Sequence, residues 1–218
     1  IQMFTYRGTP EAQEIWNVAA FEQKNNWTHF EVTGEKKGTL IFYTGALVEP
    51  QAYAKLADGL AKEGIEVYLI SSQLNLPVLD NGTMATIVKK EHLDKVFLGG
   101  HSLGGVVSIV EAKNLNENNK VAGLILLASY PDKSTDISNT TIPVLSITAS
   151  NDKILNQEKY QDGKSRLPQS TIYTTIEGGN HSGFGLYGQQ NGDGEATLEA
   201  EKQQEQLIQL IKNFIETH

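Results

Sequence analysis

The chain has 218 residues, of which 39% are hydrophobic and 20% charged, and this mixture favours one folded domain over a disordered or fibrous chain. Its net charge of −8 argues against a nucleic-acid partner, because no basic surface is expected. Cysteine is absent, which excludes disulfides, thiolate metal sites and a cysteine nucleophile. No apolar run approaches the roughly 20 residues that cross a bilayer, so we expect no membrane span in this chain.

The N-terminal residues, Ile1 to Arg7, lack the pattern of a signal peptide. The chain begins with Ile rather than Met, so we expect that an upstream segment was removed by processing or cloning. We interpret residues 1–218 as a single domain, in which about residues 1–27 form an N-terminal extension. The sequence identifies neither the compartment nor the oligomeric state.

Strand-like and helix-like segments alternate along the chain, which predicts a largely parallel sheet covered by helices on both faces. Apolar runs rich in β-branched residues predict buried strands at Thr39–Tyr43, Glu66–Ile70, Lys95–Leu98, Val121–Leu127, Val144–Thr148 and Thr171–Ile176. Helical patterns cover Pro50–Glu63, which Gly64 should end, Val106–Leu115 and about Leu198–Glu216. Within the last helix we expect the Gln- and Glu-rich stretch Glu201–Gln206 to be a solvated face.

Two loops stand out between these elements. Pro131–Thr141 is polar and too short to fold into a lid, so we expect a nearby site to be open to solvent. The segment Gly178–Gly194 holds seven glycines, which indicates close backbone packing or positive φ at several positions. Inside it, Asn191–Glu195 lacks the ligand spacing of a calcium loop, and we interpret it as a turn. We expect no metal and no cofactor.

The strongest chemical signal is the pentapeptide Gly100-His101-Ser102-Leu103-Gly104, between a predicted strand and a predicted helix. It matches the pattern G-x-S-x-G, in which a tight strand-to-helix turn exposes a serine hydroxyl to a base. Gly100 and Gly104 lack Cβ atoms, so the backbone can cross itself, and N–H groups at the helix N-terminus can bind an oxyanion. The pentapeptide alone also fits an ordinary glycine-rich turn.

A serine on such a turn needs an acid and then a histidine, each at the carboxyl end of a later strand, where they converge over the serine. Asp152 follows the predicted strand Val144–Thr148, and His181 follows the predicted strand Thr171–Ile176. The order and the placement both agree with nucleophilic catalysis by the serine.

Other acids and histidines remain as alternatives. Asp132 also follows a predicted strand, and we prefer Asp152 to it as the acid. Asp193 comes after the histidine and so is in the wrong order. We expect the side chain of His101 to point away from the turn and to pack or hydrogen-bond around it. The remaining histidines are interpreted as surface or satisfied polar residues: His29, His92 and His218.

Four segments of the chain resemble the α/β-hydrolase superfamily: Gly100-His101-Ser102-Leu103-Gly104-Gly105, Leu127-Ala128-Ser129-Tyr130-Pro131, Asn151-Asp152 and Gly178-Gly179-Asn180-His181. Phe42-Tyr43-Thr44-Gly45-Ala46-Leu47-Val48 and Phe184-Gly185-Leu186-Tyr187-Gly188 are similar to a small, lidless bacterial branch, mostly known only as hydrolases. The resemblance runs from about Thr39 to the end. It implies a three-layer α/β-hydrolase fold with a mostly parallel central sheet, helices on both faces and no lid domain. Members often carry an amino-terminal membrane anchor, which would place this domain outside the cell; without one it would be cytoplasmic.

The resemblance also implies roles for individual residues. Ser102 would be the nucleophile, His181 the general base and then acid, and Asp152 the group that orients and charge-stabilises the imidazole. The oxyanion would be held by the N–H of Leu103 and by a second N–H from the loop after the Thr39–Tyr43 strand. For that second donor we expect Ala46, with Leu47 as the alternative.

Together these inferences predict a serine hydrolase of the carboxylesterase type that forms an acyl-enzyme and takes a small-molecule ester as its substrate. Because no lid is expected, we predict short or accessible acyl groups. The pocket walls would come from Leu47, Leu74, Leu76, Pro77, Phe184 and Tyr187. A thioesterase or amidase with the same triad, or a non-catalytic ligand-binding protein on the same scaffold, remain the alternatives.

Overall fold

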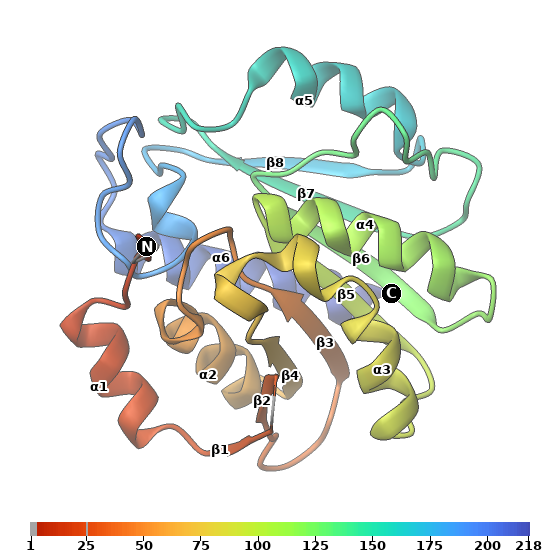
Figure 1. Ribbon diagram of the computed structural model, residues 1–218, viewed down its shortest axis with the longest axis horizontal. Coiled ribbons are helices and arrows are strands. Elements are labelled where there is room, and N and C mark those ends of the chain that lie inside the picture. The colour runs from red at the N-terminus through yellow and green to blue at the C-terminus, as the bar shows by residue number, and fades with distance from the viewer. Residues whose placement is uncertain (1–3, 25) are drawn as a thin grey trace.

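The computed structural model describes residues 4–24 and 26–218, so residues 1–3 and 25 of the predicted extension lie outside the described residues. Its strands form one eight-stranded sheet in the order β1-β2-β4-β3-β5-β6-β7-β8 (Figure 1). All neighbours from β4 to β8 are parallel, whereas β1 and β2 form an antiparallel edge. The strands are β1 (Phe21–Gln23), β2 (Trp27–Phe30), β3 (Gly38–Tyr43), β4 (Ile65–Ile70), β5 (Val96–His101), β6 (Val121–Leu127), β7 (Val144–Ala149) and β8 (Ile172–Ile176).

Helices cover both faces of this sheet, as predicted (Figure 1). Side chains of α2 and α6 join the apolar cluster on one face, where α1 packs beside them, and those of α3 and α4 join the cluster on the other. The helices are α1 (Pro10–Val18), α2 (Ala54–Lys62), α3 (Thr83–Lys90), α4 (Leu103–Asn116), α5 (Gln157–Gly163) and α6 (Ala200–Thr217). Short 3₁₀ turns are η1 (Pro50–Tyr53), η2 (Gln73–Asn75), η3 (Pro77–Asp80), η4 (Lys164–Arg166) and η5 (Ser182–Phe184).

The predicted strands are all present, but β8 is not buried. It lies at the open edge of the sheet and exposes most of its side chains, including Ile172 and Tyr173. Its β-branched and aromatic composition therefore reflects strand propensity rather than burial. At the opposite edge, β1 lies within the segment that the sequence suggested was an extension, and it pairs with β2.

The predicted helices are also present, with one correction. The helix predicted from Pro50 begins as the η1 turn and continues as α2, and Gly64, with a φ of 93°, follows its end. In α6, however, Gln203 and Gln204 are fully buried, so the expectation that Glu201–Gln206 is a solvated face is wrong for these two residues, whereas Lys202, Glu205 and Gln206 are exposed. Both glutamines lie one turn before the apolar stripe of the helix and bond to backbone groups of the loop after β8.

The loop that follows β6 forms no lid. Residues 128–143 contain neither a helix nor a strand, in agreement with the expectation for Pro131–Thr141. None of the helices in the described part of the chain combines the length and the apolar character that a bilayer span requires. Because β3, β5, β7 and β8 run in the same direction, their carboxyl ends lie at one rim of the sheet.

Candidate active site

Ser102 lies at the sharp turn between β5 and α4. Its φ of 53° and ψ of −120° are unusual for a residue with a side chain, and strain of this kind is common at functional sites. The turn is closed by glycines: a Cβ on Gly100 would overlap the carbonyl of Gly104, and a Cβ on Gly104 would overlap the carbonyl oxygen of Thr44. The sequence thus forms the predicted strained turn with Ser102 at its apex.

Asp152 follows β7 in a turn that fixes its carboxylate. One oxygen, Oδ1, accepts the backbone N–H groups of Ile154 and Leu155, each at 2.8 Å. The other oxygen, Oδ2, lies 2.8 Å from Nδ1 of His181. The side chain of Asp152 is fully shielded from solvent, and that of His181 is 2% exposed, so this pair is held in a dry environment.

The loop that carries His181 is anchored by α6. The amide of Gln203 accepts the N–H of Asn180 at 3.1 Å and donates to the carbonyl of the same residue at 2.9 Å. A Cβ on Gly179 or Gly183 would overlap this glutamine. The glycine density of the loop therefore permits close packing against α6, as predicted, and the residue before His181 is held on both of its backbone groups.

His101 lies beside the catalytic candidates but away from the cavity. Its Nδ1 is 2.8 Å from the hydroxyl of Tyr53, and its ring packs against those of His181 and Phe184. Burial lowers the pKa of His101 well below its ordinary value, and the neighbouring His181 lowers it further. This agrees with the expectation that His101 packs and hydrogen-bonds around the turn.

The backbone N–H groups of Leu103 and Ala46, near Ser102, donate to no acceptor in the described part of the chain. The N–H groups on either side of Ala46 are occupied. Gly45 donates to the Tyr53 hydroxyl at 2.8 Å, and Leu47 donates to the carbonyl of Asn75 at 2.6 Å. Of the two donors that the sequence left open, Ala46 is therefore the one that is free, and Leu47 is not.

A cavity of about 170 Å³ contains both Ser102 and His181. Its other lining residues are Leu103, Val106, Ala128, Ser129, Tyr130, Ile154, Leu155 and Asn156. Ser129 also donates from its hydroxyl to the carbonyl of Ser102 at 2.8 Å. None of these residues was predicted as a pocket wall, although Ile154 and Leu155 lie only two and three positions after Asp152.

The side chains predicted to wall the pocket lie elsewhere. Phe184 and Tyr187 are buried in the apolar core, and Leu74 is 65% exposed on the η2 turn. Leu47 helps to close the loop after β3. None of these, nor Leu76 or Pro77, is among the residues that line the cavity shared by Ser102 and His181. Their position in the chain near β3, β4 and His181 gave no information on which way each side chain faces.

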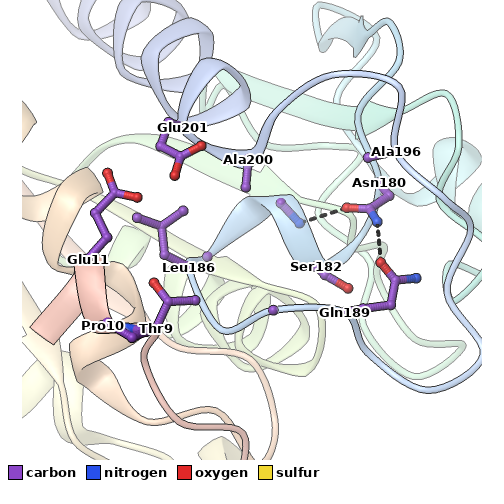
Figure 2. Close-up of a pocket in the computed structure, with 13 residues that line it drawn as sticks. Thr9, Pro10, Glu11, Asn180, Ser182, Leu186, Gln189, Ala196, Ala200 and Glu201 are labelled. Carbon is purple, nitrogen blue, oxygen red and sulfur yellow. Dashed lines mark hydrogen bonds between the residues drawn. The ribbon is translucent and has the colours of Figure 1, made fainter.

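A second cavity, of about 320 Å³, lies behind the loop that carries His181. Figure 2 shows Glu11 and Glu201 on one side of it and Asn180 and Ser182 on the other. Neither Ser102 nor His181 is among its lining residues. The smaller cavity is therefore the candidate site.

One group of potential metal ligands occurs in the described residues, far from this site. Glu22, His29 and Glu31 bring their ligand atoms within 4.8 Å of one another on the β1–β2 edge. Glu22 is paired with Lys24 at 2.8 Å, and His29 with Glu66 at 3.0 Å. Glu22 and His29 thus already have partners within the protein.

The rival acids occupy other roles. Asp132 bonds the N–H and hydroxyl of Ser134 within its own loop, whereas Asp193 bonds Ser182 and Lys153. Asn191–Glu195 forms the expected turn, in which the N–H of Asp193 donates to the carbonyl of Gln190.

One family model and a number of solved structures are similar to this chain. A model described as "Alpha/beta hydrolase family" matches residues 39–205, while no curated protein matches the sequence. Among solved structures, a CIB-like hydrolase from Thermoplasma acidophilum has a TM-score of 0.65 and 16% identity, covering 89% of this chain and 97% of that chain.

Two further structures have the same fold. An esterase from Pyrobaculum calidifontis has a TM-score of 0.67 and 13% identity, over 95% of this chain and 88% of that chain. A soluble variant of the monoglyceride lipase from Saccharomyces cerevisiae, in complex with a substrate analogue, has a TM-score of 0.61 and 14% identity, over 91% of this chain and 94% of that chain. At these identities the likeness is one of fold alone.

Proposed function

The chain belongs to the alpha/beta hydrolase family and is a hydrolase, and we propose that it cleaves carboxylic esters through an acyl-enzyme on Ser102. The observation that carries this proposal is the Asp152–His181 hydrogen bond beside a cavity that Ser102 and His181 share. A serine, an imidazole and a carboxylate arranged in this way are the components of nucleophilic acyl transfer.

The tautomer of His181 suits a general base. An ionised carboxylate can only accept, so the hydrogen between Asp152 and Nδ1 belongs to the imidazole. The lone pair is then on Nε2. In the first half-reaction Nε2 takes the proton of the Ser102 hydroxyl while Oγ attacks the ester carbonyl, and the protonated imidazole then gives that proton to the leaving alkoxide.

The second half-reaction repeats these steps with water. His181 takes a proton from a water molecule, whose oxygen attacks the acyl group on Ser102. Collapse of the tetrahedral intermediate returns the proton to Oγ and releases a carboxylic acid. In both halves the free N–H groups of Leu103 and Ala46 are the donors available to stabilise the oxyanion.

The size of the cavity supports short acyl groups. At about 170 Å³ it is smaller than the roughly 300–1,000 Å³ of common ligand pockets. Its walls are apolar at Val106, Ile154 and Leu155, and no lid extends them. A long acyl chain would therefore leave much of its surface in water, whereas an acetyl or butyryl group would not.

Hydrolysis of p-nitrophenyl acetate, butyrate and octanoate tests this proposal. We expect kcat/KM to be highest for the two short esters, and Ser102→Ala to lower the rate by at least about 10³-fold. Ser134→Ala, which removes a hydroxyl from an exposed loop, is the matched control and should keep the wild-type rate. Undiminished hydrolysis by Ser102→Ala would refute the assignment, and no hydrolysis by the wild type would favour a ligand-binding role.

A further inference from the structure

The segment Asp193–Glu195 contacts every residue that flanks the Asp152–His181 pair. Asn151 and Lys153 are the chain neighbours of Asp152, and Asn180 and Ser182 are those of His181. The contacts are Lys153 N–H to Asp193 Oδ1 at 3.3 Å, Ser182 N–H to Asp193 Oδ2 at 2.8 Å, Asn180 Nδ2 to the Gly194 carbonyl at 2.8 Å, and Asn151 Nδ2 to the Glu195 carbonyl at 2.9 Å.

The carboxylate of Asp193 bonds both loops, which also contact each other directly: the N–H of Asn151 donates to the carbonyl of Gly179, and the N–H of Gly178 to the Ser150 hydroxyl, each at 2.8 Å. Its Oδ2 accepts both the N–H and, at 2.7 Å, the hydroxyl of Ser182, while its Oδ1 accepts the N–H of Lys153. The Ser182 hydroxyl in turn accepts the N–H of Gln190 at 2.9 Å, so its hydrogen is directed to the carboxylate. An amide has only one acceptor oxygen and could not serve both loops.

Close packing around this segment leaves it little freedom. A Cβ on Gly194 would overlap the carbonyl oxygen of Asn151. Figure 2 shows the amide of Asn180 also bonded to Gln189. The segment therefore connects the β7 and β8 loops by side-chain and backbone bonds at once.

We propose that Asp193 is a positioning residue that holds the loop of Asp152 against the loop of His181, and so sets the geometry of their hydrogen bond. This inference rests on the proposed function, since a hydrolase needs that geometry only if His181 is its base. The two residues are on separate loops, so the length of their bond depends on how the loops are held. Asp193 does not reach the reacting atoms, and its effect passes through the imidazole.

Asp193→Asn tests this role, with Asp132→Asn as the matched control. Both carboxylates accept the N–H and the hydroxyl of a nearby serine, but Asp132 does so within a single loop. For Asp193→Asn we expect kcat for p-nitrophenyl acetate to fall about 10- to 100-fold with KM within about twofold, because small misplacements of a base are costly. The control should keep the wild-type kcat.

A second readout does not depend on activity. A proton held between Nδ1 and an ionised carboxylate gives a low-field proton NMR signal, which His181→Ala should abolish and so assign. We expect the signal to be lost or shifted upfield in Asp193→Asn and unchanged in Asp132→Asn. An unaltered signal together with an unaltered kcat would overturn the inference.

The remaining outcomes are also decisive. If Asp193→Asn does not fold, Ser182→Ala removes the hydroxyl bond to Asp193 and the acceptor of the Gln190 N–H, while the Ser182 N–H bond to Asp193 remains. A several-fold loss of kcat at constant KM would support the role, whereas no loss would overturn it. If the wild type hydrolyses no ester, the proposed function fails, yet the NMR comparison still tests whether Asp193 holds the pair together.

Discussion

Nδ1 of His181 lies 2.8 Å from Oδ2 of Asp152, although 29 positions separate these residues in the chain. The backbone N–H groups of Ile154 and Leu155 hold the other oxygen of the same carboxylate. One oxygen is thus used to fix the side chain and the other to orient the imidazole. An acid that is fixed in this way selects the tautomer of His181 that can accept a proton at Nε2.

Replacement of this acid should slow turnover severely. Asp152→Asn keeps the shape of the side chain but allows its amide to donate to Nδ1, which favours the wrong tautomer. We expect kcat to fall by about 10³- to 10⁴-fold with little change in the fold. Asp132→Asn should change kcat less than about twofold, because Asp132 bonds only within its own loop. Equal losses, measured by steady-state kinetics, would reopen the choice between the two acids.

Loss of the Ala46 N–H should weaken oxyanion binding. Ala46→Pro removes this donor. Proline restricts the backbone of the residue before it, and glycine, which has no Cβ, is the residue type that tolerates this restriction best; here that residue is Gly45. We expect kcat to fall about 10²- to 10³-fold. Ala46→Gly retains the N–H and is the control that should remain active. If the glycine variant loses as much as the proline variant, the effect belongs to the loop and not to the donor.

A side chain at Gly104 should disrupt the turn that carries Ser102. Its Cβ would overlap the carbonyl oxygen of Thr44, so Gly104→Ala must displace backbone rather than a flexible side chain. We expect the free energy of unfolding, measured with urea, to fall by about 1–3 kcal/mol and the activity to be lost. Gly82→Ala is the comparison: its φ of 98° costs about 1–2 kcal/mol of strain, but no atom lies within 4 Å of the added Cβ. That variant should keep the activity of its folded fraction.

The lowered pKa of His101 predicts a pH dependence of stability. Burial and the neighbouring His181 keep this residue neutral in the folded state, whereas in the unfolded chain it titrates near pH 6.5. Below about pH 6.5 the unfolded state therefore binds a proton that the folded state does not, and the free energy of unfolding declines as pH falls. His101→Phe removes this contribution, so its loss of stability between about pH 7 and pH 5.5 should be smaller than that of the wild type. The free energy of unfolding of each protein can be measured by urea denaturation at several pH values. An equal decline with falling pH in both proteins would contradict this prediction.

Much of the fold was predictable because its strands are continuous apolar runs. A parallel sheet buries both faces of each strand, and that pattern is visible in β3 to β7 without any knowledge of their neighbours. The edge strand β1 was missed because three residues of mixed polarity carry no such pattern. Its pairing with β2 is a long-range property.

The candidate site was predictable where residue type and strand order restrict it, as for Ser102, Asp152 and His181. The supporting residues were not. Gln203 lies four residues before Leu207, so the two share the buried face of α6. This spacing could have indicated that Gln203 is buried, but its polar side chain favoured an exposed position. Asp193 gave no comparable signal, because an Asx turn and a bridge between two loops look alike in the sequence. The pocket walls depend on side-chain directions that only the folded loops determine.

The most direct measurement is the site of covalent modification by a fluorophosphonate, identified by mass spectrometry of the intact protein and its peptides. A serine with an activated hydroxyl is expected to form one phosphonyl adduct per chain, on Ser102, with no adduct in Ser102→Ala and slow modification in His181→Ala. Labelling of a different residue, or labelling that persists in Ser102→Ala, would contradict the account.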